Sequence, residues 1–331
     1  MLIDPKLTPI ADDILQLTLP LPFALNHVHC YLLRGDKGWS IVDTGINIQN
    51  NQSAWLDIFA NNGIDMRDIE QIVLTHVHPD HFGMAGWLQG MGEMAGVHIP
   101  IYASEREEEM ADIVWRQNYP DFNFGDWMIT NGMPEAQGRD VAASMDNTRA
   151  MTMPYPNDLE RISAGETIVM GNRTFEMIHT PGHADGHIVF YDADDQLMLS
   201  GDHILNKITP NIGLWSHSDP DPLGRYLGSL VDLLDYEVRV ALPGHKTLIE
   251  DWRGRINELL GHHDTRLAHI HDAITDGKRT PFAIAQVIFP AERFTAHEWR
   301  FAIAEVLAHL EYMKLKGEVV QKENQAIFDL A

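Results

Sequence analysis

The chain has 331 residues, 44% of them hydrophobic and 22% charged, so it is long enough to bury one large core or two modest ones. Its formal net charge of −24 disfavours general affinity for nucleic-acid backbones, because that affinity requires clustered Lys and Arg. The sequence has no apolar run near the ~18 residues of a membrane span, no signal-peptide pattern and only one cysteine, Cys30, so we expect a cytoplasmic protein that does not enter a membrane.

The N-terminal part of the chain predicts alternating strands and helices. Residues 13–45 are typical of strands broken by turns. Residues 50–62 carry apolar side chains at helical spacing, and this helix is expected to end near Gly63. Another helix is expected after His81. Strand-like and helix-like segments then alternate to about residue 250, which indicates an α/β layered fold.

The most informative stretch is a short run of metal-binding residue types directly after the apolar residues 72–74. Within six positions it holds His76, His78, Asp80 and His81. Imidazole nitrogen and carboxylate oxygen are the donors that a borderline metal ion such as zinc accepts. A lone histidine on an apolar face is usually a packed core residue, but four such side chains in this order indicate a metal site.

Three later sites repeat the arrangement of a short apolar run followed by a glycine-bearing turn and a donor. These turns contain His183, Asp202 and His245. Glycine lets the backbone bend so that the next side chain can enter a shared cavity. Four loops at one end of a sheet would thereby bring seven donors to one place.

This pattern, which runs from about Leu21 to His245, resembles the metallo-β-lactamase superfamily and in particular its glyoxalase II-type members. The resemblance implies an αββα sandwich with a one- or two-metal hydrolytic centre. It also implies that one metal is bound by His76, His78 and His183, a second by Asp80, His81 and His245, and that Asp202 bridges the two. Because all seven positions are filled, two divalent ions are expected, with zinc favoured and manganese or iron as alternatives.

The resemblance further implies hydrolysis by a hydroxide that bridges the two metals, so that no Ser or Cys nucleophile is needed. Asp80 is the candidate catalytic residue, because it could bind a metal and also orient this hydroxide. The expected substrate is a small molecule, namely a thioester, an ester or a lactone. Two alternatives stay open at this point, a phosphodiesterase or endoribonuclease and a non-catalytic metal-binding module.

Residues 104–156 stand apart as a segment rich in methionine and aromatic side chains between the first ligand block and His183. One interpretation is a cap insertion that supplies an apolar wall for the substrate. The other, given equal weight, is an added helical layer or a subunit contact, because such residues at helical spacing more often form core. The aromatic residues concerned are Trp115, Tyr119, Phe122, Phe124 and Trp127.

Residues 251–331 are predicted to form a second domain after a catalytic domain of residues 1–250. Thr295 and Glu298 fit a helix capping box, and a predicted hairpin follows Gly317. Helices followed by a hairpin resemble the winged-helix-like addition of some superfamily members. This region has ten Lys and Arg against twelve Asp and Glu, a net charge of −2 that disfavours nucleic-acid binding. We therefore expect a structural or dimer-forming addition, and a homodimer stays open.

Several other polar residues have both a functional and a structural interpretation. His27, His29, His187 and His203 could each hold a ligand's second ring nitrogen, although such histidines are more often simply hydrogen-bonded or exposed. The substrate space could be lined by Tyr155, Asn206, Trp215 and His217.

Overall fold

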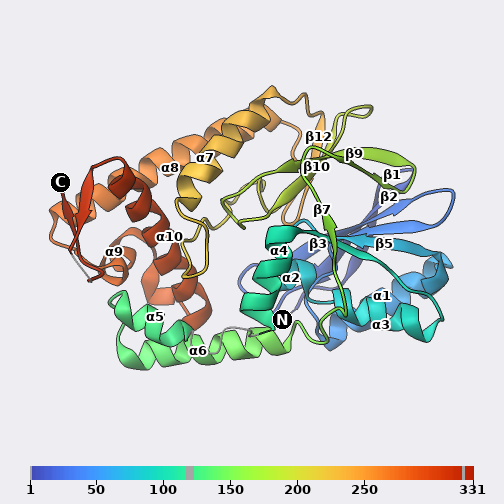
Figure 1. Ribbon diagram of the computed structural model, residues 1–331, viewed down its shortest axis with the longest axis horizontal. Coiled ribbons are helices and arrows are strands. Elements are labelled where there is room, and N and C mark those ends of the chain that lie inside the picture. Colours follow the sequence, from blue (N-terminus) through green and yellow to red (C-terminus); the bar gives the residue numbers. More distant parts are fainter. Residues whose placement is uncertain (1, 117–122, 323–324) are drawn as a thin grey trace.

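The computed structural model describes residues 2–116, 123–322 and 325–331. Two β-sheets lie face to face with helices on their outer sides, and a helical C-terminal region lies beside them (Figure 1). The predicted αββα sandwich is therefore confirmed. Buried side chains from both sheets fill the space between them, among them Tyr31, Val73, Phe175, Phe190 and Leu242.

The first sheet has seven strands in sequential order. Its first four strands are antiparallel, and β4 to β7 are parallel. The strands are β1 (Lys6–Ala11), β2 (Ile14–Pro20), β3 (His27–Arg34), β4 (Trp39–Val42), β5 (Ile69–Val73), β6 (Ile101–Ser104) and β7 (Glu160–Ile162).

The second sheet has five strands in the order β12-β11-β10-β9-β8, and only the pair β11–β12 is parallel. Every residue of β10 and β11 is buried, as expected for short apolar runs with cover on both faces. The strands are β8 (Thr167–Met170), β9 (Arg173–His179), β10 (Ile188–Asp192), β11 (Leu197–Gly201) and β12 (Val240–Pro243).

Helices cover the outer face of each sheet. On the first sheet lie α1 (Gln49–Asn62), the short α2 (Pro79–Phe82) and α3 (Ala85–Met94), and their apolar side chains join one core cluster. Helix α1 ends as predicted at Gly63, whose φ of 64° is left-handed and whose N–H bonds Ala60 O. On the second sheet lie α7 (Pro222–Asp232) and the start of α8 (Trp252–Thr275).

In its described part, the segment 104–156 contains the α-helices α4 (Glu105–Met110), α5 (Phe124–Thr130) and α6 (Glu135–Ala150) and a short π-helix, Ala111–Trp115, and it connects the sandwich with the C-terminal region. Met128, Met133 and Val141 share one core cluster with α8, α9 and α10. These helices thus pack on the C-terminal region, and the choice between a cap and an added helical layer stays a prediction. Tyr119 and Phe122, named above within this segment, lie outside the described residues.

The C-terminal region consists of α8, α9 (Pro281–Ile288), α10 (Ala296–Leu315) and an antiparallel pair of strands, β13 (Val319–Gln321) and β14 (Phe328–Leu330). Thr295 and Glu298 form the predicted capping box at the start of α10. The predicted hairpin after Gly317 is also present. The likeness to a winged helix and the boundary at residue 250 stay predictions. No helix in the described part of the chain combines the length and the apolar character that a membrane crossing requires.

Candidate metal centre

The seven predicted donors all lie at one end of the sandwich, just beyond the ends of its strands. The run from His76 to His81 follows β5, and His183 lies in the connection between β9 and β10. Asp202 follows β11, and His245 follows β12. The two sheets therefore bring together residues that are up to 169 positions apart in the sequence, as the glycine-bearing turns predicted.

Three histidines form the first group of donors. His78 Nδ1 lies 3.0 Å from His76 Nε2 and 2.9 Å from His183 Nε2, so three ring nitrogens point at one small space. Burial lowers the pKa of His78 to about 3, and it also lowers the pKa values of His76 and His183. Neutral imidazole is the form that binds a metal ion, so this group needs no deprotonation before binding.

Asp80, His81 and His245 form the second group, in which a nitrogen or oxygen of each lies within 4.8 Å of the others. Burial alone would lower the pKa of His245, but the Asp202 and Asp80 carboxylates outweigh burial and raise this pKa to about 9. Burial would likewise raise the pKa of Asp80, yet His81 and His245 hold it below its usual value. Without a cation, this half is therefore a buried cluster of mutual ion pairs.

Asp202 lies between the two groups. Its Oδ2 is 3.6 Å from His183 Nε2 of the first group and 3.1 Å from His245 Nε2 of the second. Its Oδ1 is 3.3 Å from His81 Nε2. Its carboxylate therefore contacts both groups, and the bridging role that the resemblance implies stays a prediction.

Two observations test whether these residues fit metal ions. His81 Nε2 and Asp202 Oδ1 are buried and face each other at 3.3 Å, yet within the described ranges neither atom makes a well-formed hydrogen bond, and a cation shared between them would satisfy both. A Cβ built on Gly244 would lie 2.3 Å from Asp202 Oδ1 and 2.6 Å from His81 Cε1, so the backbone leaves room only for the donors. The donor set therefore fits divalent cations.

The outward nitrogens of the ligand rings are held by other parts of the chain. His183 Nδ1 lies 2.8 Å from the backbone oxygen of Asn211, and His245 Nδ1 lies 2.6 Å from that of His27. Such contacts fix the ring orientation and the tautomer, which keeps the opposite nitrogen free for a metal.

Asp43 is a supporting residue that sequence reasoning missed as such. Its Oδ2 lies 2.8 Å from His81 Nδ1, and its carboxylate also accepts hydrogen bonds from the backbone N–H and the hydroxyl of Thr75. The Thr75 hydroxyl in turn lies 2.9 Å from His76 Nδ1. One feature of the sequence could have identified Asp43 as a supporting residue. It directly follows β4, which is the neighbour of β5 in the sheet.

The other histidines considered from the sequence make hydrogen bonds within the protein. His187 accepts from the Asp202 backbone N–H through Nε2, so it supports the predicted bridging residue indirectly. His203 bonds the Ser229 hydroxyl, and His29 bonds the Lys246 carbonyl. Of the four residues proposed to line the substrate space, Trp215 and His217 do so, whereas Tyr155 and Asn206 are not among the lining residues.

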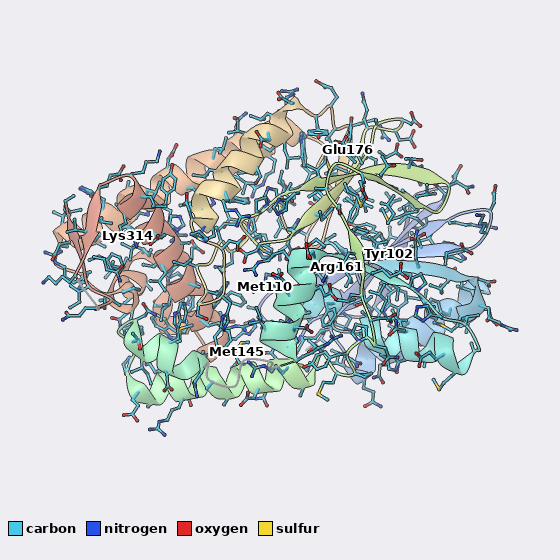
Figure 2. The ribbon with its side chains drawn as sticks, in the orientation of Figure 1. Tyr102, Met110, Met145, Arg161, Glu176 and Lys314 are labelled. Carbon is cyan, nitrogen blue, oxygen red and sulfur yellow. The ribbon has the colours of Figure 1, made fainter. Side chains whose placement is uncertain are left out.

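A cavity of about 390 Å³ opens over the donors. His78, Asp80, His183 and Asp202 line it, so only one side of the cluster faces this space. The remaining walls are mainly apolar and come chiefly from the loop between β2 and β3, the segment 104–156, residues 205–218 and α10. Met110 and Met145, labelled in Figure 2, are two of these residues. Other apolar lining residues are Leu21, Phe23, Trp115, Phe124, Ile208 and Phe301.

Glu107 is a further buried carboxyl group in the cavity wall that sequence reasoning did not single out. Its two oxygens accept hydrogen bonds from Val77 N at 2.7 Å and from Gly186 N at 2.8 Å, so it joins the first ligand loop to the loop after His183. Burial raises its pKa to about 7, although the two backbone amides oppose this shift.

Comparison with known proteins agrees with this arrangement. The family model described as the metallo-beta-lactamase superfamily matches residues 24–245, and the metallo-beta-lactamase-like C-terminal domain matches residues 267–328. The "Probable metallo-hydrolase YqjP" of Bacillus subtilis (strain 168) is 26% identical over 318 residues, which cover 93% of this chain and 94% of that protein.

Two solved structures cover nearly the whole chain. A metallo-beta-lactamase family protein from Thermus thermophilus has a TM-score of 0.86 at 31% identity and covers 98% of this chain and 100% of its own. A beta-lactamase domain protein from Burkholderia ambifaria has a TM-score of 0.85 at 26% identity, and the match covers 98% of this chain and 94% of that protein. This chain therefore belongs to the metallo-beta-lactamase superfamily and is a metal-dependent hydrolase within it.

Proposed function

We propose that the chain is a two-metal hydrolase that cleaves a small carboxylic derivative, namely a thioester, an ester or a lactone. The observation that carries this proposal is the meeting of seven imidazole and carboxylate donors at the polar end of an otherwise apolar cavity. An apolar cavity of this size suits an acyl or alkyl group rather than a nucleic-acid strand. The net charge of −24 also disfavours a polyanionic substrate.

In this proposal, His76, His78 and His183 hold one ion, Asp80, His81 and His245 hold the other, and Asp202 lies between them. When bound, a pair of divalent ions lowers the pKa of water toward ~7 and polarises the substrate carbonyl. Imidazole and carboxylate donors favour zinc, and manganese or iron are the alternatives.

The residues of the chain position the reaction. Asp80 lines the cavity and has a lowered pKa, so its carboxylate is ionised and placed to accept a hydrogen bond from the attacking water and thereby orient it. The apolar walls exclude competing water and hold the acyl group over the donors.

One relative supports the choice of substrate class. The "Atrochrysone carboxyl ACP thioesterase dmxR1" of a Cryptosporiopsis species is 21% identical over 268 residues, which cover 80% of this chain and 63% of that protein. Thioester cleavage requires the same attack of water on an acyl carbon that we propose here.

The test combines metal analysis with a substrate panel. Elemental analysis of the purified protein should find two transition-metal ions per chain, and His183→Ala should lose about one of them. The matched control is His98→Ala, because the His98 side chain is 55% exposed and lies outside the donor cluster.

The metal-loaded wild type should hydrolyse at least one of three acyl substrates, an N-acetylcysteamine thioester, a p-nitrophenyl ester or a γ-lactone. Bis-p-nitrophenyl phosphate should be a poor substrate. Failure on all three acyl classes with zinc, manganese and iron, or preferred cleavage of the phosphodiester, would overturn the proposal.

A further inference from the structure

The end of the cavity away from the β-strands is built partly by α10, and this helix contributes an arginine. His297, Glu298, Arg300 and Phe301 all line the cavity from α10. The guanidinium of Arg300 is nearly sealed from bulk solvent, since the residue is only 5% exposed. A buried cation that lines the cavity above a hydrolytic centre needs an explanation.

The contacts of Arg300 leave most of its hydrogen-bonding capacity unused. Nη1 contacts the Met145 sulfur, Nη2 lies 3.4 Å from His297 Nδ1, and the guanidinium carbon lies 4.4 Å from the centre of the Phe301 ring. Nε is buried without a hydrogen-bond partner, and among residues 2–116, 123–322 and 325–331 no carboxylate forms an ion pair with this guanidinium. An arginine offers five N–H donors, so this environment is poor for it.

Other largely buried arginines of the chain are neutralised directly. Arg173 pairs with Asp13 at 2.6 Å and with Asp192 at 2.7 Å. Arg266 pairs with Glu305 at 3.3 Å. Arg300 therefore departs from the way in which this fold stabilises buried cations.

The nearby acidic groups have other partners. Glu298 accepts hydrogen bonds from the backbone N–H and the hydroxyl of Thr295 in the capping box. Asp80 attracts Arg300 at longer range but belongs to the donor cluster, where it interacts with His81 and His245. Burial lowers the pKa of Arg300 to about 10, so the group stays charged at neutral pH. The guanidinium thus carries its charge in the cavity wall without a direct ion pair to either of these carboxylates.

We propose that Arg300 binds a carboxylate carried by the substrate at the end remote from the scissile bond. The proposal rests on the proposed function, because it requires a hydrolysable acyl group at the donor cluster. The preferred substrate is then an ω-carboxyacyl thioester or ester, in which an apolar stem joins the reacting carbonyl to a terminal carboxylate.

The geometry and chemistry of the site support this substrate class. Guanidinium pairs with a planar carboxylate through two parallel hydrogen bonds, and removal from water strengthens the pair. Phe23, Met110 and Phe124 provide apolar surface for the stem. The cavity volume of about 390 Å³ suits a short stem with a singly charged end.

His297 supports the arginine in the proposed site. Its ring stacks on Phe23 with the centroids 4.1 Å apart, which joins α10 to the loop between β2 and β3. Burial lowers the pKa of His297 to about 4, so the ring is neutral and adds no second charge. Arg300 is therefore the group at this end of the cavity that would pair with the carboxylate of the substrate.

The test uses two substrates that differ only in the terminal charge. These are the N-acetylcysteamine monothioester of adipic acid and the methyl ester of the same compound. The metal-loaded wild type should favour the carboxylate form by at least about 10-fold in kcat/KM, since loss of a buried charge partner commonly exceeds a tenfold effect. Equal kcat/KM for the two forms would overturn the proposal.

Arg300→Met should lose at least about 10-fold in kcat/KM on the carboxylate form, mainly through KM, and change less than about 3-fold on the methyl ester. Arg300→Lys should keep part of the preference because it keeps the charge. Arg139→Met is the matched control, because Arg139 is an exposed residue of α6 that pairs with Glu135. This variant should leave kcat/KM unchanged on both substrates. Equal losses on both substrates in Arg300→Met would assign Arg300 a structural role and overturn the proposal.

A binding measurement separates this proposal from the proposed hydrolysis. Calorimetric titration of the metal-loaded wild type should show adipate bound at least about 10-fold more tightly than hexanoate, and Arg300→Met should abolish this difference. If these thioesters and the ester and lactone of the substrate panel are all left uncleaved, the proposed function fails while the adipate preference still decides the role of Arg300. If Arg300→Met does not fold, the two-substrate and two-ligand comparisons on the wild type and Arg300→Lys decide the outcome.

Discussion

The two ends of the cavity are built in different ways. The donor end consists of loops that directly follow β-strands, and its rings are held on their outer sides by residues such as Asp43 and Asn211. The opposite end consists of helices from the segment 104–156 and from α10. The strand ends fix the donors in place, whereas the helices supply a wall that can vary without disturbing those donors. We therefore expect changes at the donor end to affect every substrate, and changes at the helical end to depend on the substrate.

The largest expected effect comes from Asp80→Asn at the donor end. The amide keeps the size of the side chain but loses the negative charge that would hold an ion and orient the attacking water, so kcat should fall by about 10²–10⁴-fold on every acyl substrate. Steady-state kinetics on the charged and neutral thioesters measures this loss. Asp158→Asn, at a side chain that is 58% exposed, is the control and should leave kcat unchanged. A loss of kcat confined to one substrate would contradict the expectation that changes at the donor end affect every substrate.

Gly244→Ala should weaken metal binding without removing any donor atom. The added Cβ would lie within 2.6 Å of both Asp202 and His81, so the donors must move apart. We expect metal affinity to fall by about 10–100-fold, the size of effect seen when the surroundings of a metal site are disturbed.

Competition with a chromophoric chelator measures the metal affinity of Gly244→Ala. Gly261→Ala is the matched control, since a Cβ at Gly261 meets no atom within 4 Å. Unchanged metal affinity in Gly244→Ala would show that the donors tolerate displacement.

Glu107→Gln should change how stability depends on pH. The pKa of the Glu107 carboxyl is about 7 in the folded protein and about 4.3 in the unfolded chain. At pH values between these two, the folded state keeps a proton that the unfolded state has lost. This contribution to stability is complete below the unfolded pKa and is lost as the pH rises toward 7, at up to about 1.4 kcal/mol per pH unit.

Thermal or urea unfolding between pH 5 and pH 7 measures this slope, with a fixed metal load. The Glu107→Gln variant should lack the part of the slope that Glu107 contributes. Glu109→Gln, on the same helix and with a side chain that is 54% exposed, should retain it. Parallel curves for wild type and Glu107→Gln would contradict the prediction.

The smallest expected effect links the two ends. Glu305 on α10 accepts a hydrogen bond from Asn211 Nδ2 at 3.1 Å, and the Asn211 carbonyl lies 2.8 Å from His183 Nδ1. Glu305→Gln should weaken this support by about 1 kcal/mol, roughly a fivefold loss of metal affinity in the group that contains His183.

Glu311→Gln, on the same helix, is the control for Glu305→Gln and should leave metal affinity unchanged. If Glu305→Gln alters substrate preference but not metal affinity, α10 acts on the substrate alone. Changes at the helical end of the cavity would then leave metal binding at the donor end unaffected.

Much of the donor end could be predicted from the sequence because each donor follows its strand at a short distance. The order of apolar run, glycine-bearing turn and donor is local, and the ends of neighbouring strands must meet. The structure brings the seven predicted residues together, although their assignment as metal ligands stays a prediction. Asp43 also directly follows a strand, but its contact with His81 spans 38 positions, so only the packed structure shows that it supports a donor.

By itself, the sequence predicted the layered fold, the candidate donors and the helices and hairpin of the C-terminal region, because periodicity, capping and turn chemistry act over a few residues. Only the tertiary structure decided that the segment 104–156 joins the C-terminal core while lining the cavity. In the sequence alone, its methionines are equally compatible with core packing and with a substrate wall. It also decided that Arg300 lines the same cavity as Asp80. No local pattern records that proximity, because burial and charge pairing depend on which distant surfaces pack together.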